Sequence, residues 1–580
     1  MDDMTPSERQ ISTTVLVIGT GGSGLRAAIE LAEAGVDVLA VGKRPKADAH
    51  TSLAAGGINA ALAMMDPDDS WQQHAADTLK ESYLLANPHT VQIVTEGAER
   101  GIRDLERYGM PFAREDDGRI SQRFFGAHSY RRTAFAGDYT GLEIQRTLIN
   151  RAVQLEVPIL DTVYVTRILV NDDGAVFGAY GFDLDDGTRY LIHADAVILA
   201  AGGHNRIWRR TSSRRDENTG DSFRLAVEAG GRLRDPELVQ FHPSGIIEPE
   251  NAAGTLISEA ARGEGGILTN ALGERFMARY DPERMELSTR DRVALACYTE
   301  IKEGRGTPNG GVWLDVSHLP RETIMTRLPR VYQTMLELQM LDITKQPIEI
   351  APTAHYSMGG VWVRPEDHGT DVPGLYAIGE ASSGLHGANR LGGNSLIELL
   401  VFGRIVGQAA AAYSAALPAQ KRSAAAVAVA RDEIAALLAA DGPENVRALQ
   451  RAIRNTMTEH AGVVRDEAGL RQGLAEVDAI EARIAEVGIH PDIAGFQDLA
   501  HAFDLKSAAL AARATLLAAL ERRETRGCHN RSDYPSLDPE LQVNLVWSPA
   551  TGVTREAIPP VPDEIAALMR EVSTVGKLQE

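Results

Sequence analysis

Residues 13–45 constrain the fold more than any other part of the chain. They read as a strand, TTVLVIG, a glycine turn, TGGSG, a helix, LRAAIELAEAG, and a second strand, VDVLAVG. That order is typical of a βαβ unit, in which both strands lie parallel in one sheet. Gly19, Gly21 and Gly24 form G-x-G-x-x-G between the first strand and the helix, the context in which this motif binds a pyrophosphate. The sequence therefore predicts a Rossmann-like α/β domain with a dinucleotide site.

The end of the second strand leaves the dinucleotide unidentified. Gly42, Lys43 and Arg44 stand where an acidic residue usually binds the ribose. A glycine turn with a purely structural role is the alternative interpretation of the motif.

Three distant segments are expected to share one sheet. The runs at 176–184 and 190–200 look like strands, and a short apolar run at 375–379 ends in glycine as the first strand does. Residues 238–350 differ in texture, with many glycines and arginines, and we expect them to form an inserted capping domain. The predicted dinucleotide-binding domain is then discontinuous, over 1–237 and 351–410, with a cleft at the junction.

The rest of the chain is expected to be helical and then irregular. Residues 411–520 are rich in alanine with helical periodicity, which predicts a helical bundle. Residues 521–580 carry several prolines and are expected to wrap the body as an irregular C-terminal segment.

Charge and cysteine content exclude several classes of protein. The chain has 59 basic and 80 acidic residues, a net charge of −21, which argues against nucleic acid as a partner. Cys297 and Cys528 are the two cysteines, too few for a disulfide framework or for an iron–sulfur cluster held by this chain alone. The polar start, MDDMTPSERQIS, lacks a signal pattern, and we expect no membrane span. Docking onto membrane subunits remains compatible with these features.

Residues 387–396, GANRLGGNSL, predict an anion site. Arg390 stands among small residues just before an apolar run that is expected to form an amphipathic helix. Glycines allow close approach to the backbone, a helix N-terminus offers free N–H groups, and arginine grips a carboxylate with two hydrogen bonds. A tight turn with a structural arginine is the alternative.

Three histidines are candidate ligands of small molecules. His50 lies in a loop before a glycine turn and is either solvated or a point of covalent attachment for a cofactor ring. His242 and His355 each stand beside a backbone-restricting residue in the expected cleft, where both can donate an N–H to a carboxylate. Satisfied core histidines are the alternative, and no metal-ligand spacing accompanies them.

Two further segments suggest proton transfer. Glu259 and Arg262 are three positions apart, so in a helical turn they share a face and can pair or pass a proton; a surface ion pair is the alternative. Ser288 to Asp291 resembles a capping box, which would fix Arg290 in the first turn of a helix.

Taken together, these segments resemble the flavoprotein subunits of succinate dehydrogenase and fumarate reductase, from about residue 13 to about 570. The resemblance rests on ten motifs in order: GTGGSG, AHTSLAAGG, TGDSFRLAVEAGG, QFHPSG, SEAARGEGG, STRDR, PTAHYSMGG, GLYAIGEA, GANRLGGNSL and TRGCHNRSDYP.

The resemblance implies a cofactor, a substrate and a role for each matched residue. FAD would be covalently attached at His50. The other cofactor-binding residues would be Gly19, Gly21, Gly24, Asp221, Glu380, Ser395 and Leu396. Succinate or fumarate would be bound by His242, Ser258, His355 and Arg390. The catalytic residues would be Arg290, which transfers the proton, and Glu259 and Arg262, which relay it. Relatives commonly have threonine where this chain has Ser258, a change that keeps the hydroxyl and loses a methyl group.

The resemblance also implies partners. Membrane anchor subunits with quinone, together with an iron–sulfur subunit, would hold the chain at the inner, cytoplasmic face of the cell membrane. There are two alternatives. One is an L-aspartate oxidase, which lacks a histidine at the position of His50; the other is a flavin-binding scaffold without substrate chemistry, which the matched catalytic residues argue against.

Overall fold

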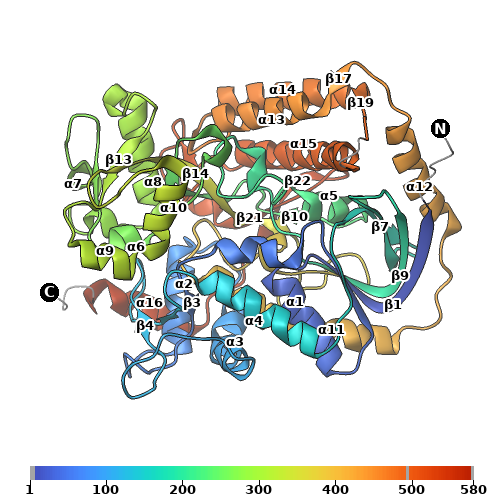
Figure 1. Ribbon diagram of the computed structural model, residues 1–580, viewed down its shortest axis with the longest axis horizontal. Coiled ribbons are helices and arrows are strands. Elements are labelled where there is room, and N and C mark those ends of the chain that lie inside the picture. Colours follow the sequence, from blue (N-terminus) through green and yellow to red (C-terminus); the bar gives the residue numbers. More distant parts are fainter. Residues whose placement is uncertain (1–6, 492–494, 576–580) are drawn as a thin grey trace.

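A computed structural model of the chain describes residues 7–491 and 495–575 (Figure 1). Three short stretches therefore lie outside the described residues: the first six residues of the N-terminal segment, residues 492–494 of the predicted bundle, and the last five residues of the C-terminal segment.

A seven-stranded sheet carries the predicted βαβ unit. Strand β1 (Glu8–Ile18) pairs in parallel with β2 (Val38–Val41) on one side and with β9 (Arg189–Leu199) on the other. The end of β9 also pairs in parallel with β16 (Leu375–Ala377). The prediction that distant segments share one sheet is confirmed. The remaining strands are β6 (Ile159–Leu160), β7 (Val163–Val170) and β8 (Val176–Asp183).

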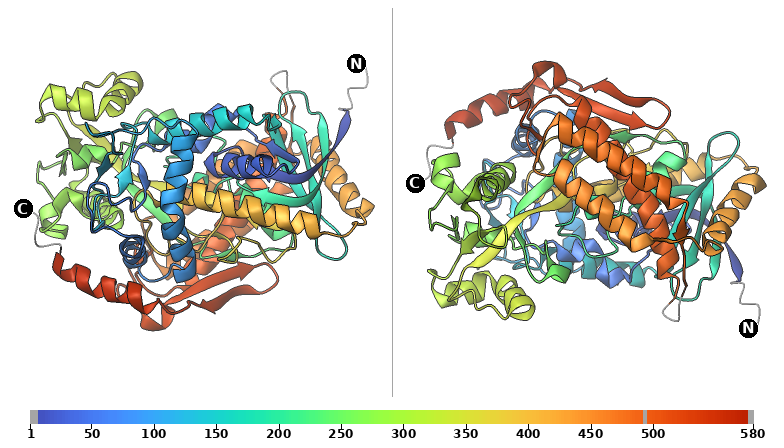
Figure 2. Two further views of the ribbon diagram at one scale, coloured as in Figure 1. Left: turned by 90° about the horizontal axis from the view of Figure 1, so that it is seen from below. Right: turned by 90° about the horizontal axis from the view of Figure 1, so that it is seen from above.

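Alternation along β1 divides the interior into two cores. Val15 and Val17 point into one core with α1 (Gly22–Glu33), whereas Leu16 points into the other. Beside α1 lie α3 (Pro88–Arg107), α4 (Thr140–Gln154) and α11 (Asn394–Ala416). The second core contains α5 (Asp221–Glu228), α13 (Val446–His460), α14 (Glu467–Ile484) and α15 (Gln497–Glu521). Figures 1 and 2 show α1 and α11 on the side of the molecule away from α13 and α14.

Helix α11 differs from the prediction. The helix has 23 residues, and the mean hydropathy of its most apolar 18-residue window is 1.4; among the described residues it is the one helix long and apolar enough to cross a membrane. Of that apolar window, 61% is buried inside the protein, between α1 and α3. The expectation of an amphipathic helix was wrong for its first half, because the run Leu396–Gly403 is buried on every side.

The region predicted to be a capping domain forms a second sheet. Its order is β11 (Val239–Ile246), β14 (Ile348–Ser357), β13 (Val312–Asp315) and β12 (Ile267–Thr269). The accompanying helices are α6 (Ala260–Gly263), α7 (Met277–Tyr280), α8 (Arg290–Glu300), α9 (Arg321–Arg327) and α10 (Pro329–Gln339). Side chains from 246 to 350 form a core of their own. Because β14 continues to Ser357, the boundaries at 238 and 350, like those at 410 and 520, remain a proposal.

The predicted bundle is helical, with α12 (Ala424–Leu438) preceding α13, α14 and α15. The C-terminal segment is more regular than predicted. Strands β21 (Val543–Ser548) and β22 (Gly552–Ala557) form a hairpin. The hairpin pairs through β21 with β10 (Leu233–Arg234), which pairs with β15 (Gly360–Val361). Helix α16 (Asp563–Val575) then contacts α2 (Trp71–Glu81), and Figure 2 shows hairpin and helix along one edge of the molecule.

Candidate active site

A cavity of about 1880 Å³ lies between the seven-stranded sheet, the second sheet and the helices after residue 440. Ligand pockets usually take roughly 300–1,000 Å³, so this cavity has room for a large cofactor and a small substrate. Most residues of the predicted site line it: Gly19, Gly21, His50, Asp221, His242, Ser258, Glu259, Arg290, His355, Glu380, Arg390, Ser395 and Leu396. Gly24 and Arg262 do not line it and act behind it.

The glycine turn is shaped for a pyrophosphate. Gly19 has a φ of +116°, which disfavours any side chain, and a Cβ there would overlap the carbonyl oxygen of Ala200. A Cβ on Gly24 would overlap the carbonyl oxygen of Gly19, so the third glycine allows helix and turn to meet. Gly21 caps α1 without a side-chain hydrogen bond. The Gly22 N–H donates to Thr51 Oγ1 at 3.0 Å, and the N–H groups that follow it at this helix start suit an anion, so the turn fits the pyrophosphate of a dinucleotide.

Asp221 closes the far end of the cavity in a network that includes an unpredicted residue. Lys43 Nζ lies 2.7 Å from Asp221 Oδ2 and 3.3 Å from Oδ1 of Asp504 on α15. Burial opposes ionisation of Asp221, but the charges of Lys43 and Arg224 hold its pKa well below the usual range. Ser507, also on α15, donates a hydrogen bond to Asp221 at 2.8 Å. Helix α15 thus supplies side chains to the cavity, a role that its alanine-rich sequence gave no reason to expect.

Glu380 lies in the middle of the cavity wall. It accepts hydrogen bonds from Asn205 Nδ2 at 2.6 Å, from the Ser357 N–H at 2.9 Å and from Asn218 Nδ2 at 3.2 Å. Burial raises the pKa of Glu380. Ser395 belongs to the first turn of α11, whose cap, Gly393, has a φ of +88°. Four residues of the segment predicted to bind an anion line the cavity: Arg390, Gly393, Ser395 and Leu396.

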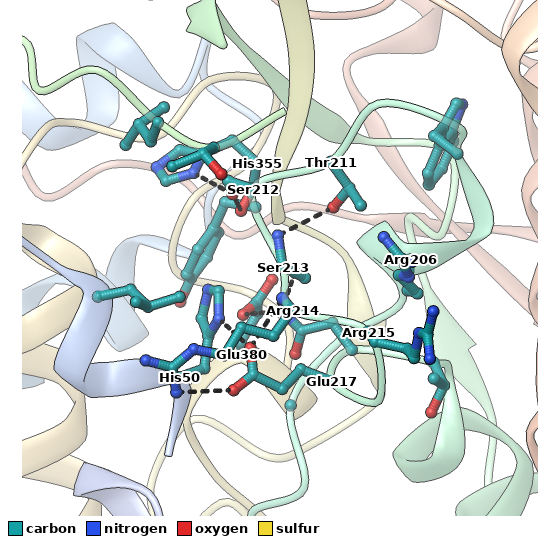
Figure 3. Close-up of a pocket in the computed structure, with 18 of the residues that line it drawn as sticks. His50, Arg206, Thr211, Ser212, Ser213, Arg214, Arg215, Glu217, His355 and Glu380 are labelled. Atoms are coloured by element: carbon teal, nitrogen blue, oxygen red, sulfur yellow. Dashed lines mark hydrogen bonds and ion pairs between the residues drawn. The ribbon is translucent and has the colours of Figure 1, made fainter. Parts of the chain in front are cut away.

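His50 is held by one of its two ring nitrogens. Nδ1 lies 2.9 Å from Glu217 Oε2, a contact visible in Figure 3. Burial opposes protonation of the ring, but this hydrogen bond and the charge of Glu217 raise the pKa of His50. No described residue forms a hydrogen bond with Nε2. The ring is thus fixed in orientation with one nitrogen left for a ligand.

His242 and His355 face each other where the second sheet meets the cavity. Their ring centroids are 5.3 Å apart and the rings are nearly perpendicular. Burial, with the charges of Arg290 and Arg390 added, lowers the pKa of both histidines well below the usual value, so both are neutral. His242 Nδ1 accepts the N–H of Ser244 at 3.2 Å, which places its proton on Nε2. A neutral imidazole can then donate one N–H to a carboxylate.

Two arginines share one amide oxygen. Gln240 Oε1 lies 3.2 Å from Nε of Arg390 and 3.3 Å from an Nη of Arg290. Gln240 Nε2 donates to Asn389 Oδ1 at 2.8 Å and to the Arg390 carbonyl at 3.0 Å, which fixes the orientation of the amide. Arg390 also stacks over the ring of Tyr356, 4.0 Å from its centroid. Burial and the charge of Arg290 lower the pKa of Arg390 to about 10, so it stays charged at neutral pH.

Sequence reasoning assigned no role to Gln240. The available signal was its position two residues before His242; both lie in β11, where alternation places side chains on the same face.

Arg290 and Glu259 form the remaining charged pair of the site. Arg290 Nε donates to Glu259 Oε2 at 2.7 Å, and an Nη of the buried Arg262 lies 3.9 Å from the same oxygen. Burial favours the neutral acid, but these two arginines lower the pKa of Glu259 to about 2. Arg290 is the first residue of α8, as predicted. The capping box is absent, because Thr289 caps α8 without a side-chain hydrogen bond and the Ser288 hydroxyl donates to Asp281 Oδ2 at 2.6 Å instead.

Comparisons with known proteins identify the family of the chain. Residues 14–396 match the FAD binding domain family, and residues 450–558 match the fumarate reductase flavoprotein C-terminal family. One relative, from the fumarate reductase (CoM/CoB) of Methanothermobacter marburgensis, is 40% identical over 92% of this chain and 96% of its own. The succinate dehydrogenase flavoprotein subunit of Rickettsia bellii is 36% identical over 94% and 97%.

Solved structures give the same result. Mycobacterium smegmatis Sdh1, solved in complex with UQ1, has a TM-score of 0.89 at 38% identity and covers 99% of this chain and 98% of its own. Escherichia coli quinol fumarate reductase FrdA has a TM-score of 0.89 at 32% identity, with coverage of 96% and 99%. The protein is thus an FAD-dependent oxidoreductase. Within that class, the chain belongs to the family of succinate dehydrogenase and fumarate reductase flavoprotein subunits, and L-aspartate oxidase is not favoured.

Proposed function

We propose that this protein interconverts succinate and fumarate with the residues assigned above, and that its FAD is covalently attached at His50. The observation that carries the proposal is the convergence of four N–H donors, from His242, His355, Arg290 and Arg390, on the cavity that contains the glycine turn. Two carboxylates need two such grips, and a substrate held at both ends is fixed relative to the cofactor.

The binding step uses neutral and charged donors together. The guanidinium of Arg390 is charged at neutral pH, and stacking on Tyr356 fixes its position. It binds one carboxylate through its guanidinium fork. His242 and His355 donate to the other carboxylate without adding positive charge. The Ser258 hydroxyl, at the cavity wall, supplies a further donor.

The proton step uses the Arg290–Glu259 pair. FAD, when bound, accepts or returns the hydride. Arg290 donates the proton to the carbon of fumarate in reduction, and Glu259, ionised beside it, holds the guanidinium in place at 2.7 Å. Arg262 touches Glu259 from behind, so the relay proposed for proton exchange runs from Arg290 through Glu259 to Arg262. In succinate oxidation the same relay must carry the proton away.

Covalent attachment is supported by the geometry around His50. Glu217 holds Nδ1, which leaves Nε2 for a bond to the methyl group of the isoalloxazine ring. Acid precipitation distinguishes the two states of the cofactor. Flavin absorbance that stays with the precipitated protein supports the attachment, whereas release of all flavin to the supernatant contradicts it.

Two observations support partner subunits: the relatives of the chain and the burial of its cysteines. Cys297 and Cys528 are both buried, so they offer no ligands for a cluster. We therefore propose an iron–sulfur partner and a membrane anchor with quinone, which place the chain at the cytoplasmic face of the membrane. The relatives differ in redox partner, since one is named for CoM/CoB and one was solved with UQ1. Full quinone-reducing activity of the purified chain alone would contradict this arrangement.

The reaction itself is tested by an anaerobic spectrum of the FAD-loaded chain. Succinate in one cuvette should bleach the flavin absorbance, and L-aspartate in a parallel cuvette should leave it unchanged. Bleaching by aspartate alone would move the chain to the oxidase class, and bleaching by neither would favour the non-catalytic scaffold.

A further inference from the structure

A cluster of arginines lines the cavity outside the dicarboxylate site. Arg206 and Arg215 belong to the segment between β9 and α5, and Arg451 and Arg454 lie on α13. The two on α13 are three positions apart, which places them on one face of the helix. Figure 3 shows Arg206 and Arg215 together, on the side of the pocket away from His50. These four residues are called the arginine cluster below.

The arginine cluster is not neutralised by carboxylates. None of its four guanidiniums forms an ion pair with any residue in the ranges 7–491 and 495–575. Asp216, whose charge acts on Arg206 and Arg454, lies 3.9 Å from Arg44 instead. The cluster is therefore a patch of positive charge without direct ion pairs, on which Asp216 and Glu217 act only from a distance, in a chain whose net charge is −21.

Burial separates this cluster from an ordinary solvated surface. Arg215 and Arg451 are exposed and well hydrated, but Arg206 and Arg454 are half-buried. Nε of Arg206 is buried with no hydrogen-bond partner among the described residues. Burial and repulsion from Arg454 lower the pKa of Arg206 to about 10. Burial, with repulsion from Arg451 and Arg215, likewise lowers the pKa of Arg454. Unpaired, partly buried cations of this kind are costly unless an anion joins them.

The pyrophosphate of the cofactor is proposed to bind elsewhere in the cavity, at the glycine turn. The atoms nearest to that turn belong to Thr51 and Ala200. The cavity is also larger than one ligand requires. A second anion thus has both charge and room to bind.

We propose that Arg206, Arg215, Arg451 and Arg454 form a second anion-binding site, which takes a small polyvalent anion bearing carboxylate or phosphate groups. Guanidinium forks match both groups by paired hydrogen bonds. The anion has two possible sources. One is the enzyme's own dicarboxylates, gathered before they reach His242 and His355, and the other is a phosphate-bearing effector.

The test measures binding by calorimetry with FAD-loaded chain carrying Arg390→Gln, which disables the dicarboxylate site. Inorganic pyrophosphate and succinate are titrated separately in about 10 mM salt, where the Debye length is about 30 Å and attraction between charges in the site is little screened. We expect pyrophosphate to bind, and Arg451→Gln with Arg454→Gln to weaken its binding about tenfold, the effect of losing one charged hydrogen bond. The matched control is Arg471→Gln with Arg483→Gln, two surface arginines of α14 that pair with Glu467 and Glu444.

Each outcome decides for or against the site. Binding of pyrophosphate alone assigns a phosphate-bearing ligand, and binding of succinate as well assigns the substrate's own class. Arg215→Gln, at an exposed position, is a second variant that should also weaken binding. It keeps the test valid if the α13 variant does not retain FAD. Unchanged affinity in both cluster variants, or no binding of either anion to the parent, would overturn the proposal. Heat of binding requires no turnover, so failure of the proposed reaction is a separate result.

Discussion

Gln240 offers the sharpest test of the substrate site, because one amide oxygen orients both arginines. Gln240→Leu removes the acceptor that lies 3.2 Å from Arg390 and 3.3 Å from Arg290. A hydrogen bond to a charged group contributes roughly 1.5–3 kcal/mol, and these distances are long, so the lower value applies to each. Loss of two such bonds corresponds to about 3 kcal/mol, or roughly a hundredfold in kcat/KM.

The assay is dye-coupled succinate oxidation, normalised to bound FAD by absorbance. Part of the loss should appear in KM through Arg390, which is proposed to bind a carboxylate, and part in kcat through Arg290, which is proposed to transfer the proton. Gln240→Glu provides a second variant. It keeps an acceptor for both arginines and adds a negative charge, which repels a dianionic substrate, so KM should rise here too.

Gln408→Leu is the matched control, an exposed glutamine on α11 that donates to Glu30 away from the cavity. It should leave kcat/KM unchanged. A kcat/KM for Gln240→Leu within threefold of the parent, with full FAD occupancy, would refute the role of this residue in orienting Arg290 and Arg390.

Three further predictions concern the cofactor and the charged pair. Gly24→Ala forces a methyl group against the Gly19 carbonyl; overpacking costs about 1–3 kcal/mol, so Tm and FAD content should both fall, and a variant with parental values would contradict the close approach. His50→Ser should retain the fold but release its flavin on acid precipitation, and retention would mean attachment elsewhere. Glu259→Gln removes a group whose pKa is lowered from 4.5 to about 2. The stability that Glu259 contributes is therefore present above about pH 4.5 and is lost as the pH falls towards 2. The Tm difference between parent and variant should shrink over that window, and a difference independent of pH would show that the pair does not stabilise the fold.

The parallel sheet and the glycine turn were predictable from sequence because local rules decide them. Strands β1, β9 and β16 end in apolar residues and each is followed closely by glycine. They pair in parallel, so their carboxyl ends lie at the same edge of the sheet. Similarly, Arg390 could be placed before a helix start from glycine spacing alone. Comparison of quoted motifs with a known family then supplied the histidines and Arg290.

Side-chain partners were beyond sequence reasoning where they depend on packing between distant segments. Asp504 reaches the cavity only because α15 crosses behind Asp221, which lies far away along the chain. Spacing at Ser288–Asp291 suggested a capping bond that the fold does not form. The apolar run of α11 suggested one face of a helix, whereas neighbours on several sides bury its first half.

The segment from Ser212 to Glu217 connects two parts of the reaction. At one end the Ser212 hydroxyl lies 2.8 Å from Nδ1 of His355, and at the other end the Glu217 carboxylate lies 2.9 Å from Nδ1 of His50. Four residues separate these two contacts in the sequence, so the length of the segment determines the distance between the His355 and His50 rings. Insertion or deletion of a single residue here would displace His355, which is proposed to bind substrate, or His50, which is proposed to anchor the cofactor, or both. Members of this family that keep both histidines are expected to vary in the composition of this segment but not in its length.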